Sequence, residues 1–252
     1  MIAPIVASQN ERKEGFDMID WHTHVLPHMD DGSHSLAESL QMLQALGEQG
    51  ITHVLATPHF YPNEDSVESF LQRRAKAYGL LAPSLGEALP TVLCGAEVAY
   101  YAGIAKMKEL KHLTVEGTDL LLLEMPMSPW RQSTVRELVE LSGVRGFRVV
   151  LAHFERAAAM QSKKTLHTLW QNGVLVQVNA GSFRGFGGRR RMLRLFKTRV
   201  AHFVGSDCHN MTTRAPNIKT ALTLIKKRCG SEFLAQMNDF GQALLARKKE
   251  NM

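Results

Sequence analysis

Cysteine is scarce in this chain, and long apolar runs are absent from it. The three cysteines, Cys94, Cys208 and Cys229, are odd in number and scattered, so they make no disulfide framework and predict a reducing compartment. No stretch reaches the roughly 18 apolar residues that a membrane span needs, and the apolar start at residues 1–6 is too short for the core of a signal peptide. We therefore expect a cytoplasmic protein with no membrane insertion.

No internal repeat, low-complexity tract or linker divides the sequence. The chain has 252 residues, 44% of them hydrophobic, which is enough to bury a substantial core. We expect a single domain at residues 18–246, with short tails at residues 1–17 and 247–252.

The formal net charge is +6 and the sequence pI is about 9.3. This balance permits attraction to anionic partners such as phosphorylated proteins, nucleic acid or acidic lipid, but it does not choose among them. Two basic runs stand out. Lys226-Lys227-Arg228 continues an amphipathic pattern and predicts a solvated helix face, whereas Arg189-Arg190-Arg191 is open to either a solvated face or a role beside a functional loop.

Short apolar runs alternate with helical patterns along the chain. Their continuous hydrophobicity is typical of strands that are buried on both faces, as in a parallel sheet. The seven expected strands are Ile19–His22, His53–Ala56, Val92–Ala96, Leu120–Glu124, Val149–Ala152, Val174–Val178 and Ala201–Gly205. Ser35-Leu36-Ala37-Glu38 has the form of a capping box and predicts a helix that ends near Gly50. Thr134-Val135-Arg136-Glu137 predicts a second helix start of the same kind.

Candidate metal ligands follow most of these strands. His22 and His24 accompany the first strand, and Asp207 and His209 follow the last. Residues two apart on a strand share a face, roughly 6 to 7 Å apart, so each pair can supply two ligands to one pocket. The candidates between the two pairs are Asp31, His59, Glu97, Glu124 and His153. Together they predict a multinuclear site for borderline or hard ions such as Mn, Zn, Fe or Mg.

The distribution of these candidates favours one α/β architecture over another. An open doubly wound sheet places its site at a switch point between a few strands. Here the candidates follow nearly every strand, which is typical of a barrel with its chemistry on the C-terminal face. We therefore expect a distorted (β/α)7 barrel.

Several short motifs occur in a fixed order and carry a family resemblance. They are His22-Thr23-His24-Val25-Leu26-Pro27, Asp30-Asp31-Gly32, Ala56-Thr57-Pro58-His59, Gly95-Ala96-Glu97, Leu123-Glu124-Met125-Pro126, Ala152-His153-Phe154-Glu155-Arg156 and Ser206-Asp207-Cys208-His209-Asn210. From about residue 18 to 225 the chain resembles the polymerase-and-histidinol-phosphatase (PHP) superfamily, and within it the metal-dependent protein-tyrosine phosphatases of bacterial capsule and exopolysaccharide loci, the CpsB/CapC type. The resemblance implies a seven-stranded barrel, three divalent metals and a membrane tyrosine autokinase as partner.

The resemblance also implies a division of the ligands among three metals. One metal would be held by His22, His24, Glu97 and Asp207, a second by Glu97, Glu124 and His153, and a third by Asp31, His59 and His209. Such a cluster, most commonly of Mn2+, lowers the pKa of a bound water and clamps phosphoryl oxygens, so no protein nucleophile is required. Arg156 and Arg214 match the phosphate-contacting arginines of the family, and a guanidinium fork suits a phosphoryl group.

The sequence departs from the family pattern around the pocket rather than at the ligands. Relatives commonly carry Pro at the position of Phe154, an aromatic residue at Ala157, Pro at Ala215 and a small residue at Cys208. These changes affect the pocket wall and the arginine-bearing loop.

The same residues allow other interpretations. Cys208 and Arg214 have the Cys-x5-Arg spacing of cysteine-dependent tyrosine phosphatases, but the residues between them include no glycine. Other functions are hydrolysis of a small phosphate monoester such as histidinol phosphate, or of a nucleotide, and a non-catalytic module that binds metal or nucleic acid. Asp20 and Glu155 could orient ligating histidines, or could equally cap or pair locally. Histidines expected to be structural or on the surface are His28, His34, His53, His112, His167 and His202. Gln177, Asn179 and Ser182 are expected to shape a loop.

Overall fold

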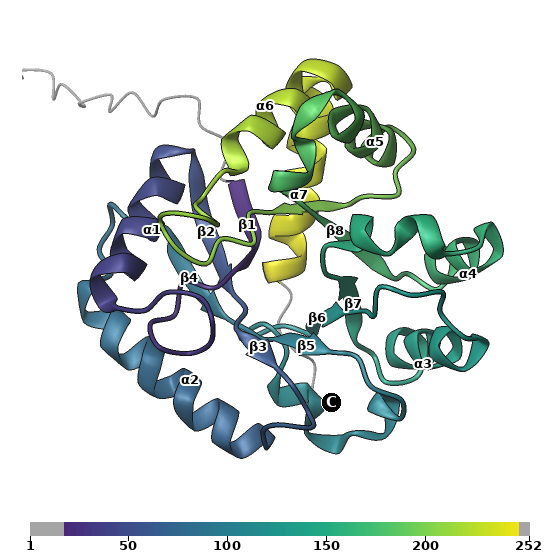
Figure 1. Ribbon diagram of the computed structural model, residues 1–252, viewed down its shortest axis with the longest axis horizontal. Coiled ribbons are helices and arrows are strands. Elements are labelled where there is room, and N and C mark those ends of the chain that lie inside the picture. The colour runs from purple at the N-terminus through teal and green to yellow at the C-terminus, as the bar shows by residue number, and fades with distance from the viewer. Residues whose placement is uncertain (1–17, 247–252) are drawn as a thin grey trace, which may run out of the picture.

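The computed structural model describes residues 18–246, so the two predicted tails lie outside the described residues. Its strands form a curled parallel sheet with helices packed around the outside (Figure 1). All seven predicted strands are present, with ends shifted by up to two residues. They are β1 (Met18–Thr23), β2 (Ile51–Ala56), β4 (Thr91–Cys94), β6 (Leu120–Glu124), β7 (Arg148–Leu151), β8 (Leu175–Asn179) and β9 (Phe203–Gly205).

Two short strands were not predicted. β3 (His59–Phe60) follows β2 after a break at Pro58, and β5 (Glu97–Ala99) follows β4 after a break at Gly95. Pro58 has no N–H to give to a ladder, which explains why β2 stops before it. The strand order is β1-β2-β4 in one segment and β3-β5-β6-β7-β8-β9 in the other. Hydrogen bonds from Gly95 N to Ala56 O (2.8 Å) and from Glu97 N to Pro58 O (3.0 Å) continue the pairing of the two chain stretches through the breaks.

The first and last strands also meet. Beyond the end of β9, Asp207 N donates to His22 O (2.8 Å), and His24 N donates to Cys208 O (3.0 Å). Closer to the middle of the strands, the rings of Trp21 and Phe203 stack with centroids 3.5 Å apart. The sheet is therefore curled far enough to bring β1 beside β9, with both sets of C-terminal ends on one side.

Seven helices are described between and after the strands. They are α1 (Leu36–Glu48), α2 (Val67–Leu81), α3 (Gln132–Gly143), α4 (Lys163–Gln171), α5 (Gly185–Lys197), α6 (Ile218–Cys229) and α7 (Ser231–Ala246). Helices α1 to α6 surround the strands, and α7 lies behind them (Figure 1). Of the helices within residues 18–246, none is long and apolar enough to cross a membrane.

One predicted helix start is confirmed and the other is wrong. Ser35 caps α1 by accepting a hydrogen bond from Glu38 N (3.1 Å), and Gly50 adopts a positive φ just after the helix. α3 begins at Gln132, before the predicted Thr134 cap, and has no side-chain cap. The Thr134 and Glu137 side chains instead accept hydrogen bonds from the Tyr100 hydroxyl, at 3.2 and 2.6 Å. A tertiary contact has replaced the local one.

Side-chain alternation places the polar site above an apolar layer. Leu121 and Leu123 face the helices, whereas Leu120 and Leu122 join a separate cluster on the concave face of the sheet. Residues two apart on a strand share a face, so Glu124 continues the row of Leu120 and Leu122 at the strand end. The functional groups therefore gather at the C-terminal ends of the strands, over a packed floor.

Candidate metal centre

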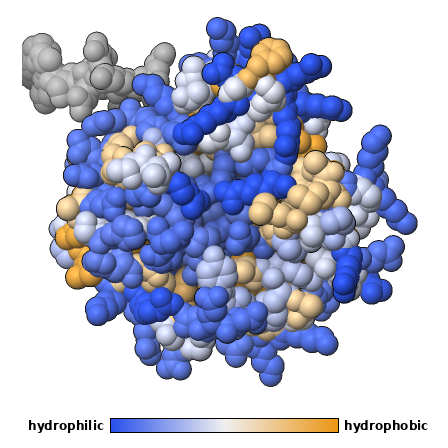
Figure 2. Space-filling view, viewed as in Figure 1, coloured by the Kyte–Doolittle hydropathy of each residue, from blue (hydrophilic) through white to orange (hydrophobic). Residues whose placement is uncertain are grey.

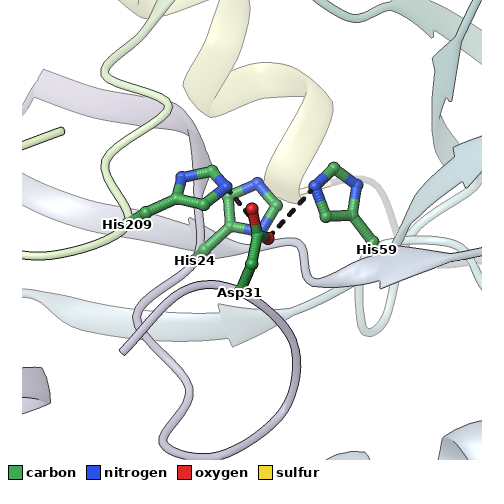
Figure 3. Close-up of side chains that lie close together, drawn as sticks. All are labelled: His24, Asp31, His59 and His209. Atoms are coloured by element: carbon green, nitrogen blue, oxygen red, sulfur yellow. Dashed lines mark ion pairs between the residues drawn. The ribbon is translucent and has the colours of Figure 1, made fainter. Parts of the chain in front are cut away.

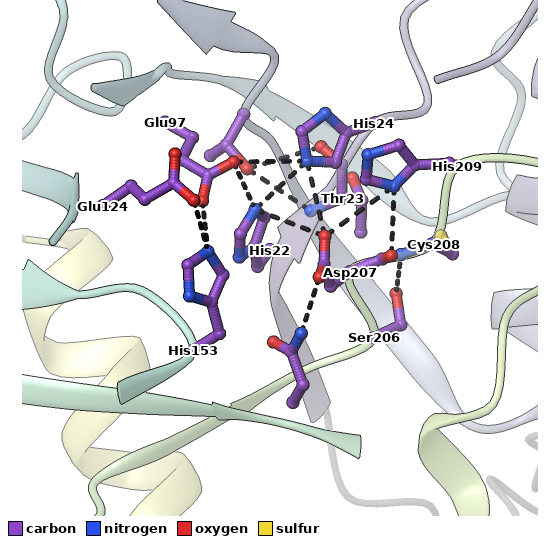
Figure 4. A network of polar contacts seen from close by, with 12 residues as sticks. His22, Thr23, His24, Glu97, Glu124, His153, Ser206, Asp207, Cys208 and His209 are labelled. Atoms are coloured by element: carbon purple, nitrogen blue, oxygen red, sulfur yellow. Dashed lines mark hydrogen bonds and ion pairs between the residues drawn. The ribbon is translucent and has the colours of Figure 1, made fainter. Parts of the chain in front are cut away.

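All nine predicted ligands converge on one site at the C-terminal ends of the strands (Figures 3 and 4). They arrive from different segments because each parallel strand ends on the same side of the sheet. The loop before α1 contributes Asp31, whose side chain is 64% exposed, whereas His22, His24 and Glu97 are buried. The site is thus open to solvent on the Asp31 side and closed beneath.

Glu97 lies at the centre of the site. Its Oε1 is 2.8 Å from Nε2 of His153, and its Oε2 is 2.9 Å from Nδ1 of His59. The same Oε2 is 3.2 Å from Nε2 of His22 and 3.5 Å from Nε2 of His24. One buried carboxylate therefore contacts four imidazoles.

The ligand atoms form three overlapping groups, each within 4.8 Å. His22, His24 and Asp207 form one group, and Glu97, which the resemblance adds to this set, contacts both histidines. Asp31, His59 and His209 form a second group together with His24, as Figure 3 shows. The third group joins Glu97 and Glu124 to His59 rather than to His153, although His153 Nε2 lies 3.3 Å from Glu124 Oε1. His24 and His59 are thus each shared between two groups.

Two of the candidate ligands have a strained backbone. His153 has φ of 30° and Asp207 has φ of 53°, both in the left-handed region that favours glycine. Non-glycine residues persist there only when the surrounding structure holds them, and such strain concentrates at functional sites. The turns direct both side chains into the cluster just past the ends of β7 and β9.

Neighbouring polar groups orient the ligands. Asp30 Oδ2 lies 2.6 Å from Nδ1 of His24, and Asn179 donates to Asp207 Oδ2 (2.6 Å). Gln177 Oε1 lies 3.4 Å from Nδ1 of His22 and accepts from His153 N (2.7 Å). Fixing the second ring nitrogen in this way determines which nitrogen faces the site. The sequence analysis missed Asp30, although it lies beside Asp31 in the same motif, and left Gln177 and Asn179 to a structural role.

Of the two alternatives for Asp20 and Glu155, the structure shows local pairing rather than contact with histidine rings. Asp20 accepts from the backbone N–H groups of His22 (3.3 Å) and Ser206 (2.8 Å). Glu155 accepts from Asn179 N and from the Ser182 hydroxyl (2.7 Å). Both carboxylates therefore hold backbone and loop groups of the site rather than imidazoles.

Arg156 and Arg214 approach the cluster from one side. Arg156 Nη2 lies 2.9 Å from Asp207 Oδ2, and Arg214 Nη2 lies 2.7 Å from Asp207 Oδ1. Arg214 Nη1 is also 3.8 Å from Asp31 Oδ2. Each arginine side chain is 39% exposed, so both guanidinium groups can meet a ligand that enters from solvent.

The pKa shifts show that the Glu97 and Glu124 carboxylates stabilise positive charge on the histidines beside them. Burial lowers the pKa of His59, but the Glu97 carboxylate outweighs it and raises the pKa to about 9. The pKa of His153 likewise rises to about 9 because Glu124 and Glu97 outweigh burial. Burial raises the pKa of Glu97, yet the surrounding histidines hold it well below its usual range. Divalent cations that take the place of these protons satisfy the same carboxylates.

The donor set fits bound metal ions. Three buried atoms in the cluster, namely Nδ1 of His59, Oε2 of Glu97 and Nε2 of His209, make no well-aligned hydrogen bond within residues 18–246, although oppositely charged groups lie 2.9 to 3.3 Å from them. Buried polar atoms are normally paired, so each unpaired one requires an explanation. Imidazole nitrogens and carboxylate oxygens with free lone pairs, converging within a few ångströms, are the ligands that Mn, Fe or Zn prefer.

Cys208 is not placed as a nucleophile. Its side chain is 0% exposed, and burial raises the pKa of its thiol far above the usual value. In a cysteine-dependent phosphatase the backbone amides between Cys and Arg would cradle the phosphate. Here the N–H groups of Thr212, Thr213 and Arg214 all donate to the Asn210 side chain, at 3.0, 2.8 and 3.1 Å. The Cys-x5-Arg spacing is therefore coincidental.

Two arginines of the first basic run are structural. Arg191 donates to the carbonyl of Glu155, next to Arg156, and Arg189 donates to the carbonyl of Phe183. Lys226, Lys227 and Arg228 are exposed on α6, as predicted. None of the six other histidines takes part in the ligand groups found within residues 18–246.

The family model for capsular polysaccharide synthesis proteins of the CpsB/CapC type matches residues 18–240. The chain belongs to the CpsB/CapC family. Among curated members it is 32% identical to the tyrosine-protein phosphatase YwqE of Bacillus subtilis, over 90% of this chain and 91% of that protein. It is 29% identical to the tyrosine-protein phosphatase CpsB of Streptococcus pneumoniae, over 85% and 92% of the two chains.

A solved structure of this family has the same fold. It comes from a crystallographic study of YwqE from Bacillus subtilis and CpsB from Streptococcus pneumoniae, described as unique metal-dependent tyrosine phosphatases. The TM-score is 0.79 at 28% identity, with 93% of this chain and 96% of that chain covered. The similarity thus extends over nearly the whole chain rather than over isolated motifs.

Proposed function

We propose that this member of the CpsB/CapC family is a metal-dependent protein-tyrosine phosphatase, a phosphoric monoester hydrolase that acts on phosphotyrosine in proteins. The observation that supports the proposal most is that the guanidinium groups of Arg156 and Arg214 both pair with Asp207, one of the nine candidate ligands. Cationic forks beside a carboxylate–imidazole cluster suit a phosphoryl group, which needs charge neutralisation on several oxygens at once.

Each residue of the site has a role in this proposal. The nine ligands would hold three divalent cations, with Mn2+ the first choice and Fe, Zn or Mg as alternatives. Bound ions of this kind supply Lewis acidity and lower the pKa of water near neutral pH. Arg156 and Arg214 would bind the phosphoryl oxygens and so orient the phosphorus for in-line attack. Asp30, Gln177 and Asn179 keep the metal ligands oriented. Cys208 takes no part.

We infer the domain that carries this site, its protein substrate and its compartment. Residues 18–246 would form one domain, a distorted (β/α)7 barrel, which the hydrogen bonds between β1 and the segment after β9 support. The substrate would be a phosphotyrosine protein, the membrane tyrosine autokinase of a capsule or exopolysaccharide locus, reached from the cytoplasm. The site lies at the C-terminal ends of the strands and is open to solvent, so an extended phosphorylated segment can enter it.

A metal-replete turnover assay tests the proposal. Phosphotyrosine peptide and histidinol phosphate would be supplied to the same preparation with added manganese, and elemental analysis would count its metals. We expect hydrolysis of the peptide, loss of activity with chelator and recovery with manganese. A preparation with three metals per chain that hydrolyses histidinol phosphate but no phosphotyrosine peptide would overturn the assignment in favour of the small-ester function.

A further inference from the structure

A second cavity adjoins the metal centre on its arginine side. Its volume is about 210 Å³, and its lining includes Arg156, Arg184, Arg214, Ser182, Thr213 and Asn217. Figure 2 shows strongly hydrophilic side chains across the middle of this face of the molecule. The cavity is therefore polar, and it is continuous with the groups that would hold the phosphoryl oxygens.

The charges in the cavity do not balance. Arg156 and Arg214 are both paired with Asp207, the one carboxylate in the lining. Glu155 lies behind Ser182, and its carboxylate already accepts hydrogen bonds from Ser182 and from Asn179 N. The guanidinium of Arg184 makes no hydrogen bond or ion pair with any residue between 18 and 246 and is exposed to solvent. The cavity therefore holds an excess of positive charge without a matching anion.

Arg184 is held in place by its backbone surroundings. It precedes α5, and Gly185 turns the chain with φ of 65°. The side chain of Arg189 binds the carbonyl of Phe183, and α5 packs so close that a Cβ on Gly188 would lie 2.6 Å from the Ser182 carbonyl oxygen. The segment that carries Arg184 is thus pinned to the rim of the cavity. Arg184 contacts none of the nine candidate ligands, so the cluster itself does not explain it.

We propose that this cavity is a second oxyanion site, which binds an anionic group beside the scissile phosphate through Arg184, with Ser182 and Thr213 at its wall. The proposal rests on the proposed function, because the anion is either part of the phosphotyrosine segment or a product of its hydrolysis. Its source is an acidic side chain next to the phosphotyrosine or the inorganic phosphate that the reaction releases. Both are oxyanions that a guanidinium fork can bind.

The test compares two phosphotyrosine peptides that differ only in having Glu or Gln beside the phosphotyrosine. We expect wild-type protein to have the lower KM for the Glu peptide, and Arg184→Ala to reduce that preference about three- to fivefold, the range of an exposed ion pair. Arg190→Ala is the matched control, because Arg190 is exposed on the same helix and does not line the cavity. It removes the same charge and should leave the preference unchanged.

Inhibition by inorganic phosphate separates the two sources of the anion. A higher inhibition constant in Arg184→Ala with an unchanged peptide preference would support the site with released phosphate as its ligand. No change in either quantity, or an equal change in Arg190→Ala, would overturn the proposal. Equilibrium binding of a non-hydrolysable phosphonate version of both peptides reports on the cavity without turnover. Failure of the phosphatase assignment is thereby distinguished from failure of the second site.

Discussion

His59 and Glu97 are direct partners in the pairing of β3 with β5, and Nδ1 of His59 lies 2.9 Å from Oε2 of Glu97. His59 and Glu97 are the first residues of strands that restart after a break. The two breaks together therefore bring this pair into the centre of the site. Because the same carboxylate also contacts His22, His24 and His153, the whole cluster depends on it.

Replacing Glu97 with Gln should disrupt more than one metal position and abolish turnover, while circular dichroism retains the folded signal. The amide keeps the shape but loses the charge that the surrounding imidazoles and metals require. Elemental analysis and peptide turnover measure both effects. Glu87→Gln is the control, because Glu87 is exposed in the segment that precedes β4, at the end of the strand opposite the site. A Glu97→Gln variant with full metal content and activity would contradict the assignment of the cluster.

Arg156→Ala and Arg214→Ala should each lower kcat/KM on a phosphotyrosine peptide. Loss of one preorganised donor to developing charge costs on the order of 2 to 4 kcal/mol, or about 30- to 1000-fold. Lys should rescue poorly at either position because it cannot form the bidentate fork. Wild-type kcat/KM in both alanine variants would remove the two arginines from their assigned role.

Cys208→Ala should retain most of the activity, because the thiol is buried, its pKa is raised and the loop amides after it are occupied by Asn210. Chelation should inactivate the wild type and manganese should restore it. The measurement is peptide turnover with parallel elemental analysis. An inactive Cys208→Ala variant that keeps its metals would favour thiolate attack instead.

Arg191→Met should lower kcat by about tenfold without loss of metal, since a misplacement of about 1 Å can slow a reaction by about 100-fold and a smaller displacement costs less. Arg191 binds the carbonyl of Glu155 and so holds the backbone that carries Arg156. Arg191→Lys should recover part of the loss, and Arg190→Met is the matched control. Equal kcat in Arg191→Met and wild type would show that Arg156 does not depend on this contact.

Acid should destabilise the fold through His202. Its Nδ1 accepts a hydrogen bond from Val176 N (3.1 Å), and burial lowers its pKa to about 4. A histidine in the unfolded chain has a pKa near 6.5. The contribution of neutral His202 to the free energy of unfolding is therefore fully present above pH 6.5 and is lost as the pH falls toward 4. Its upper bound is about 3 kcal/mol. His202→Asn keeps an acceptor without a titrating group. Denaturant unfolding of the chelated proteins at pH 7.5 and 5 should show a smaller loss in the variant, and equal losses would contradict this role.

The local sequence pattern was sufficient to predict those strands whose burial requires apolar residues along their whole length. Strands such as Leu120–Glu124 and Leu175–Asn179 are recognisable because a strand covered on both faces must be apolar along its length. The Ser35 cap was also predictable, since it satisfies its own helix. Thr134 was mispredicted because the Tyr100 hydroxyl, over 30 residues away in sequence, competes for its side chain. Strands of two or three residues, as at His59 and Glu97, leave no periodic signal.

The sequence by itself determined which residue types could form the site, because histidine and carboxylate at successive strand ends can serve few purposes other than metal binding. Only the tertiary structure decided how they are grouped: Glu97 among four imidazoles, His24 and His59 shared between groups, and Arg184 at the rim of a separate cavity. The physical reason is that convergence depends on chain breaks at Pro58 and Gly95, on left-handed turns at His153 and Asp207, and on the curl that brings β1 to β9. Those are properties of contacts between distant segments, which no local pattern contains.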